Sequence, residues 1–369
     1  MIAEPRRAAA SFELSDASGV VRQAGAAEAQ IGDDALTVGP VTVSFLDADA
    51  VSAADYRIEL DVWPDGRLVV SQLGRRFDTF LQELRRVRNQ ARVAGMLAHG
   101  LTMPDVFLGA ILSDAGHQPA EVQVYDTHVT VVPSNGDPWQ LPLGALTVVR
   151  THDEPPGVVL QTNTSLTTIG QLGRRRDACE AAIVERREAQ GRLLAEVIGQ
   201  NGFSDGWGLP QGEIRDFEQM VERFSAPERA PCCRVLLAAA TRPPRIGFAQ
   251  LLDPDRDRLS CPASLPENWA VFLLVPVGAL SVLEIIAGPA AATYVFRGDI
   301  DAVNLDLQLL HFRRAPLALT DDQAQLGPNN PHRLALRRLE PLQRLRSITV
   351  ARVIHNDGWN EGLGFAIRT

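Results

Sequence analysis

The sequence contains no lysine: all 36 of its basic residues are arginine. Every chemistry that requires a primary amine is therefore excluded, including a Schiff-base lysine, a P-loop lysine, the strand lysine of protein kinases and a serine-lysine nucleophile pair. Because arginine replaces lysine acceptably on most surfaces, this absence restricts the chemistry without pointing to a function.

Cysteine is scarce as well. The 369 residues include four cysteines, and none of them falls in a C-x-x-C pair, so we expect reduced and mostly buried thiols. Neighbouring cysteines can join only in a strained ring, and we therefore read Cys232 and Cys233 as buried residues at the start of an apolar strand. The other two are Cys179 and Cys261.

Metal-binding and nucleotide-binding signatures are also missing. The segment DPDRDR at 253–258 copies half of a calcium loop, but Arg258 and Ser264 stand where that loop needs glycine and glutamate. We expect no metal, no cofactor and no catalytic site, although a triad assembled from distant residues stays open. No H-E-x-x-H motif or i, i+4 pair joins the histidines, which are His99, His117, His128, His152, His311, His332 and His355.

Positive charge is in deficit. The net charge of −9 and the pI near 5.4 argue against nucleic acid and anionic membranes as partners, because both require a surplus of basic groups. The N-terminal segment has no apolar region of a secretion signal, so we expect a cytoplasmic protein. Residues 269–296 are apolar but interrupted by proline, glycine and Glu284, which favours short buried strands over a membrane span.

Two stretches of the sequence are repeated in the same order. QLGRR occurs at 72–76 and again at 171–175, each time with an aspartate two residues later. Upstream, EAQIGDDALTVGP at 28–40 matches EVQVYDTHVTVVP at 121–133 at six of thirteen positions. The second copy has six extra residues between these blocks, and we place them in the turn segment 134–140. The repeats indicate a duplicated unit.

Each copy is predicted to be a set of short strands followed by one helix. The first helix is expected from Arg75 to Leu97, with Arg85, Arg86, Arg88 and Arg92 facing water, and the second from about Arg174. The hairpin WPDG at 63–66 joins the last two strands of the first copy. The expected strands are 11–14, 20–22, 27–31, 36–38, 41–46, 56–62 and 67–72, then 106–112, 122–125, 128–132, 145–149, 158–162 and 166–169.

The repeated QLGRR is predicted to be the corner between the last strand and the helix. Gly74 and Gly173 would take backbone angles that other residues avoid, and Asp78 would complement the helix dipole, as would its counterpart Asp177. Leu73 and its counterpart would seal the junction from inside.

Seven or so antiparallel strands closed by a C-terminal helix resemble a pleckstrin-homology-like (PH-like) barrel, and residues 10–198 resemble the tandem PH-like domains of uncharacterised bacterial proteins. The resemblance implies binding of phosphoinositides, peptides or proteins. The loop SDASG at 15–19 has no basic residue where the lipid-binding versions cluster them, which favours protein contact. The expected fold is α+β, with PH-like domains at 1–100 and 101–198, a linker with a short helix at 199–232, and a third α+β domain at 233–369.

The third domain is expected to contain strands and then helices. It is either a new unit or a much altered copy of the first two. Its VIHNDGW resembles VIGQNGFSDGW at the end of the second copy, and we read both as helix C-caps followed by a tryptophan that anchors on the body. The expected strands are 234–240, 245–251, 270–277, 280–286 and 292–297, with helices at 300–313 and from 334 or 341 to 354.

Two arginine pairs are the polar feature that the repeat conserves. Arg75 with Arg76, and Arg174 with Arg175, are candidates for an anion-binding site at the helix starts. The alternative is local pairing with strand carboxylates such as Glu59 or Asp61. A further set of arginines, which we expect on a solvated helix face, consists of Arg337, Arg338, Arg344, Arg346 and Arg352.

The sequence therefore predicts a non-enzymatic scaffold that binds a protein partner or its own copy. The alternatives are a sensor of a small anionic ligand or lipid headgroup and, behind it, a hydrolase with an unrecognised constellation.

Overall fold

The computed structural model describes residues 6–64, 66–95, 103–113, 116–162, 165–198, 228–250, 269–286, 292–310, 312–320 and 333–368, with the single positions 218, 221, 222 and 225. The possible calcium segment 253–258, Cys261, Trp207, and the histidines at 99, 311 and 332 lie outside these residues. Most of the expected linker 199–232 does so too.

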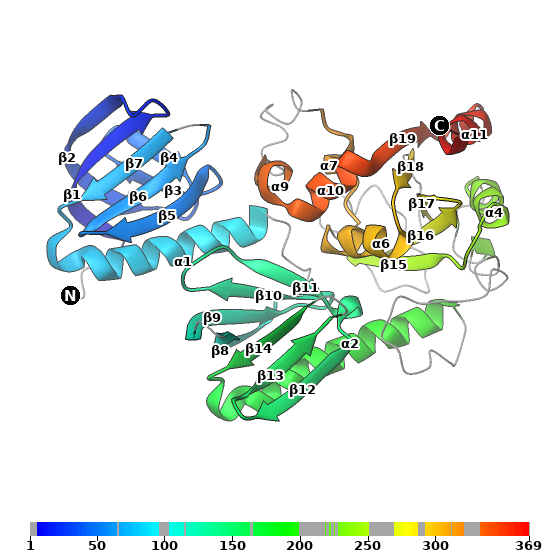
Figure 1. Ribbon diagram of the computed structural model, residues 1–369, viewed down its shortest axis with the longest axis horizontal. Coiled ribbons are helices and arrows are strands. Elements are labelled where there is room, and N and C mark those ends of the chain that lie inside the picture. Colours follow the sequence, from blue (N-terminus) through cyan, green and yellow to red (C-terminus); the bar gives the residue numbers. More distant parts are fainter. Residues whose placement is uncertain are drawn as a thin grey trace.

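The first module, residues 7–95, is a seven-stranded antiparallel sheet that curls over one helix, α1 (Phe77–Gly95) (Figure 1). Alternate strand residues point inward, as a sheet with one buried face requires, and pack against Phe80 and Leu84 of α1. The strand order is β4-β3-β2-β1-β7-β6-β5. The strands are β1 (Arg7–Asp16), β2 (Val21–Ile31), β3 (Ala35–Val38), β4 (Val41–Ser44), β5 (Ala48–Ala54), β6 (Arg57–Val62) and β7 (Gly66–Ser71).

The second module, residues 105–198, repeats this plan with the order β11-β10-β9-β8-β14-β13-β12. Its helix α2 (Arg176–Ile198) follows β14 as α1 follows β7, and Cys179 and Ile183 of α2 enter the core. The strands are β8 (Asp105–Ser113), β9 (Gly116–Val124), β10 (His128–Pro133), β11 (Trp139–Pro142), β12 (Val148–Asp153), β13 (Pro156–Gln161) and β14 (Leu166–Gly170), with the short helix η2 (Leu143–Ala145) after β11.

The duplicated plan and the corner are confirmed, with local corrections. The segments 20–22 and 27–31 form one strand, β2, and the strands β5 and β11 were missed. The β5 sequence ADAVSAA consists mostly of small residues with low strand propensity, so no alternation marks it. Val131 pairs with Trp139 whereas Val38 pairs with Val41, so five of the six extra residues lie in the β10–β11 turn.

The third domain is a five-stranded antiparallel sheet with helices on both faces (Figure 1). Its strands are apolar on both faces because each face is covered: α4 and α11 pack on one side, and α6 and α10 on the other. The strands, in sheet order, are β15 (Arg245–Gln250), β16 (Trp269–Val277), β17 (Leu280–Ile285), β18 (Ala292–Arg297) and β19 (Thr349–Ile354). The helices are α4 (Ala230–Ala238), α6 (Ile300–Leu309), α7 (Ala315–Ala318), α9 (Arg333–Arg338), α10 (Glu340–Ile348) and α11 (Trp359–Arg368).

Several predictions for this domain were wrong. Residues 234–240 lie mainly in helix α4, which therefore holds Cys232 and Cys233 and contains the expected boundary at 233. The stretch 341–354 is helix α10 and then strand β19, because Thr349 begins a β-branched run that pairs with β18. The consecutive strand order differs from that of the two modules, so the domain is no altered copy of them.

The apolar stretch 269–296 forms strands where it is described, as expected. Among the described helices, none combines the length and the apolar character that a bilayer crossing needs.

Candidate functional site

The two QLGRR corners have the same geometry. Gly74 and Gly173 have φ of 54° and 55°, and the preceding Gln72 and Gln171 also have positive φ, at 60° and 57°. This region favours glycine, so the two glutamines carry strain that the sequence did not reveal. Leu73 and Leu172 are buried, and Asp78 and Asp177 lie in the first turns of α1 and α2, as predicted.

The second arginine of each pair binds the first strand of its own module. Arg76 Nη1 donates to the carbonyl oxygen of Arg7 at 2.6 Å, and Arg175 Nη1 donates to that of Val106 at 3.0 Å. Both acceptors lie at the start of the module's first strand. The Arg175 guanidinium also lies 4.5 Å from the centre of the Phe107 ring. These two arginines therefore have a structural role.

The first arginine of each pair is exposed. Among the described residues, neither Arg75 nor Arg174 forms a hydrogen bond or an ion pair, and the expected carboxylate partners Glu59 and Asp61 pair with Arg67 instead. The helix starts that carry the two corners lie apart in Figure 1, so the structure does not unite the four predicted residues in one site.

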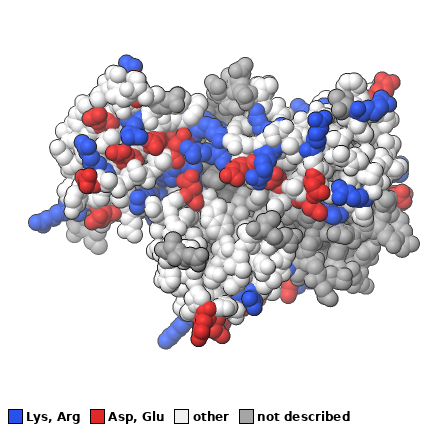
Figure 2. All heavy atoms as spheres, in the orientation of Figure 1, with Lys and Arg blue, Asp and Glu red and all other residues white. Residues whose placement is uncertain are grey.

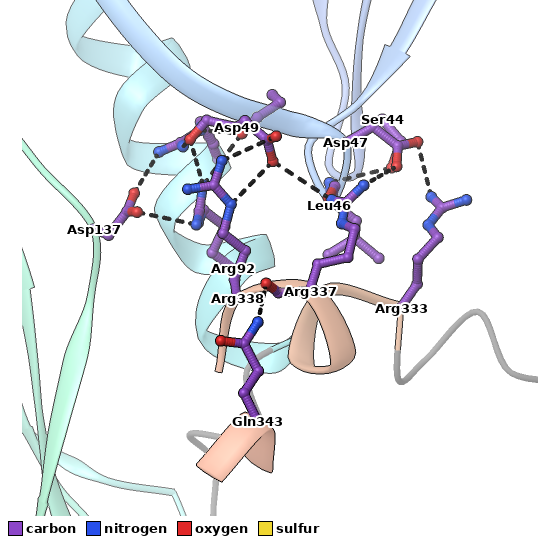
Figure 3. A network of polar contacts seen from close by, with 12 residues as sticks. Ser44, Leu46, Asp47, Asp49, Arg92, Asp137, Arg333, Arg337, Arg338 and Gln343 are labelled. Atoms are coloured by element: carbon purple, nitrogen blue, oxygen red, sulfur yellow. Dashed lines mark hydrogen bonds and ion pairs between the residues drawn. The ribbon is translucent and has the colours of Figure 1, made fainter. Parts of the chain in front are cut away.

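The densest polar network lies where the three domains meet, and helix α1 is its centre (Figure 3). Arg88 Nη1 lies 3.2 Å from Asp137 Oδ1, and Arg92 Nη2 lies 3.0 Å from Asp137 Oδ2. Asp137 belongs to the β10–β11 turn, and Asn89 Nδ2 donates to the turn carbonyls of Pro133 and Gly136 at 3.0 and 3.1 Å. The extra residues of the second copy thus form the turn that α1 of the first module binds.

Arg88 and Arg92 were expected to face water, and that prediction was wrong. They are 4% and 1% exposed, and both donate to the carbonyl oxygens of Ala48 and Asp49 on β5. Burial lowers the pKa of both guanidinium groups, that of Arg92 to about 10, with the Arg88 charge as a further cause. Both remain charged at neutral pH. Residues 81, 84, 88 and 92 lie three or four positions apart and therefore on one face of the helix. Because Leu81 and Leu84 are apolar, this spacing could have predicted from the sequence that Arg88 and Arg92 are buried as well.

Helix α9 of the third domain binds the other side of the same segment. Arg333 Nη2 lies 2.9 Å from Asp47 Oδ2, and Arg338 Nη2 lies 2.9 Å from Asp49 Oδ2. Arg337 lies between them, 3.4 Å from Asp47 Oδ1, donating to the Leu46 carbonyl oxygen and stacking 4.9 Å from the Trp63 ring centre. Figure 3 shows these arginines side by side below Asp47 and Asp49.

An apolar contact accompanies these ion pairs. Leu334 of α9 is fully buried against Gly95 at the end of α1. A Cβ atom on Gly95 would lie 2.7 Å from Leu46 Cδ2 and 3.1 Å from Leu334 Cδ2, so the close approach requires glycine.

The arginine set predicted to form a solvated helix face is instead distributed among contacts. Arg337 and Arg338 join the junction, Arg344 pairs with Asp306 at 2.6 Å, and Arg346 Nη1 donates to the Pro316 carbonyl at 3.4 Å. Arg352 lies on strand β19, outside any helix. Asp47, Asp49 and Asp137 were missed because only the fold brings these turn and strand residues to the arginines.

A second buried network lies inside the third domain. The Glu284 carboxylate accepts hydrogen bonds from Thr293 Oγ1 at 2.5 Å and from the Ile285 amide at 3.1 Å, and lies 3.0 Å from His355 Nε2. Trp359 Nε1 donates to Thr293 Oγ1 at 2.7 Å. Trp359 is thus the buried anchor that was predicted, but Asn356 to Gly358 follow a strand and precede α11, so the C-cap interpretation was wrong.

The thiols of Cys232 and Cys233 feel the charge of that network. Burial raises the pKa of Cys233 to about 12 and also raises that of Cys232, and the Glu284 charge adds to both shifts. Neither thiol is therefore ionised at neutral pH, which removes the nucleophilic form. Within the described part of the chain, no three histidine, cysteine or acidic residues form a group that could hold a metal ion.

The modules differ in one exposed surface. Val106 and Leu108 of β8 are 38% and 71% exposed, next to each other on one face of the sheet. They pair with Gln123 and Glu121, whereas the corresponding partners in the first module, Gln30 and Glu28, face Arg7 and Ala9. The second module thus exposes two apolar side chains where the first exposes an arginine and an alanine.

No protein-family model matches the chain, and no curated protein matches its sequence.

Proposed function

We propose that the chain is a non-enzymatic scaffold whose two modules are PH-like domains and which binds a protein partner. The strand order of each module, with the first strand between the second and the seventh and the helix last, supports the PH-like assignment. The arginine contacts between the domains support a scaffold, because they hold three units in one arrangement.

The observation that carries the proposal is the exposed pair Val106 and Leu108. Large apolar side chains that lie together on a surface mark contact sites more often than isolated ones do. Figure 2 shows basic and acidic side chains alternating across the first module and the third domain, while the visible face of the second module is mostly uncharged. The second module is therefore the binding unit in this proposal.

The test uses three proteins: the wild type, a double variant that carries both Val106→Arg and Leu108→Arg, and a control variant, Ala9→Arg. The control adds a charge at the position of the first module that corresponds to Leu108. Purified tagged protein is used to capture partners from a bacterial lysate, and sedimentation velocity measures self-association. We expect a specific partner, or a concentration-dependent dimer, to be lost in the double variant and kept in Ala9→Arg. Equal binding by all three proteins would contradict the proposal.

The second candidate is a sensor of a small anionic ligand or lipid headgroup, and one observation favours it. Arg75 and Arg174 are exposed at the same position of both corners, beside the amides that begin each helix. The test is thermal stabilisation by inorganic phosphate, which the combined Arg75→Ala and Arg174→Ala substitutions should abolish. An unchanged melting temperature in phosphate excludes this candidate.

A further inference from the structure

We propose that the segment from Leu46 to Asp49, with the end of α1, is a docking site for arginine-bearing helices. The chain's own α9 occupies it here, and a basic helix of a protein partner binds there in its place. This inference rests on the proposed function as a protein-binding scaffold and names the chemistry of one partner segment.

Charge complementarity defines the occupant. Asp47 and Asp49 receive three guanidinium groups from α9, and the receiving side chains are 19% and 24% exposed. The contacts follow helical spacing, since Arg333 and Arg337 lie four residues apart and both bind Asp47. A helix with arginines at positions i, i+4 and i+5 therefore satisfies both aspartates at once.

The site also selects for shape. The side chains of Leu334 and Leu46 both pack against Gly95, and the Trp63 ring lies under the Arg337 guanidinium. Arginine suits this position better than lysine would, because its planar group stacks on an aromatic ring while its edge donates to the Leu46 carbonyl and Asp47. The recognised pattern is thus Arg-Leu-x-x-Arg-Arg.

Helix α9 is suited to being replaced. It has six residues, far fewer than the ~12 that an isolated helix needs for stability, so its helical form depends on the contacts it makes. Its outermost arginine, Arg338, is 37% exposed, and ion pairs of this kind contribute little individually and weaken with salt. By contrast, Arg88 and Arg92 on the opposite side of the segment are buried and fix the receiving loop.

The experiment measures binding of a labelled peptide of residues 333–338, stapled as a helix, to the full-length protein by fluorescence anisotropy. One variant, called the vacated variant, combines Arg333→Gln, Leu334→Gln and Arg337→Gln, which remove the side chains by which α9 occupies the site. Arg344→Gln serves as the control, because Arg344 pairs with Asp306 and Glu340 inside the third domain. We expect the vacated variant to bind the peptide at least about tenfold more tightly than the wild type and the control.

Adding Asp47→Asn and Asp49→Asn to the vacated variant should remove that gain, with near-UV circular dichroism showing that the fold persists. A peptide in which glutamine replaces every arginine should not bind. Equal affinities of wild-type and vacated protein, or a gain that survives the aspartate substitutions, would overturn the proposal. The double variant at Val106 and Leu108 tests the proposed function at a different surface. Failure of the proposed function and failure of this docking site can therefore be told apart.

Discussion

The two modules share a strand order and a corner but differ in what their helices contact. At equivalent positions, 99 residues apart, α1 has Phe80 and Leu84 in the core where α2 has Cys179 and Ile183. Further along, the buried Arg92 of α1 corresponds to Gly191 of α2. The helix of the first module therefore serves both its own sheet and the junction.

The ion pairs at the module starts have also changed places. In the first module Arg6 binds Asp33 and Glu83, whereas in the second Arg186 of α2 binds Asp105 and Asp126. Arg186, which interrupts the apolar pattern of α2, is explained by these two carboxylates. Both modules therefore have one arginine that binds two carboxylates. The arginine precedes the first strand in the first module and lies on the helix in the second.

The largest expected difference between the modules concerns their cores. Phe80→Ala should lower the free energy of unfolding of the first module by about 4 kcal/mol, because a large buried ring leaves a cavity. Cys179→Ala at the equivalent position should cost about 1 kcal/mol, since only a thiol is removed. Hydrogen exchange of the strand amides measures both modules separately. Equal losses would show that the two cores are packed alike after all.

The junction gives the next effect. Arg92→Met should lower the free energy of unfolding by about 2 kcal/mol, because Asp137 and two carbonyl groups each lose one of their two guanidinium donors, the other being that of Arg88. Arg86→Met, on the exposed side of the same helix, should cost less than about 1 kcal/mol. Urea denaturation compares the two variants. The junction would be dispensable if Arg92→Met were as stable as its control.

Acid should affect the first module through Glu83, which has Ala182 as its counterpart. Hydrogen bonds from Arg86 and then Arg6 lower the pKa of Glu83 to about 2 from its ordinary 4.5. Because the folded pKa is the lower one, this stabilisation is complete above pH 4.5 and is lost as the pH falls toward 2. We expect a loss of about 1 kcal/mol over that range that Glu83→Gln does not show. Parallel pH profiles of the two proteins would refute this.

The smallest effect is expected where the modules are alike. Arg76→Met and Arg175→Met each remove one exposed hydrogen bond to a first-strand carbonyl, and each should cost about 0.5 kcal/mol. Thermal unfolding should show similar small shifts. A much larger loss for Arg175 would show that its contact with the Phe107 ring outweighs the shared hydrogen bond.

Prediction from sequence succeeded where the signal is local. The corner residues Gly74 and Gly173 and the buried Leu73 and Leu172 were predicted because backbone angles and apolar position are read along a few residues. It failed at β5 and β19, whose pairing partners decide their structure, and at α4, whose apolar run suits a helix and a buried strand equally.

By itself, the sequence determined that one unit occurs twice, that each copy ends in a helix after a glycine corner, and that no reaction here uses a lysine amine. Only the tertiary structure decided which arginines are buried. The buried Arg88 and Arg92 and the half-buried Arg337 look like other surface arginines along the chain. What distinguishes them is their contact with the carboxylates of Asp47, Asp49 and Asp137. A buried charge is tolerated only beside a partner, and folding alone brings these partners together, since Asp137 lies 49 residues from Arg88 and Asp47 lies 290 residues from Arg337.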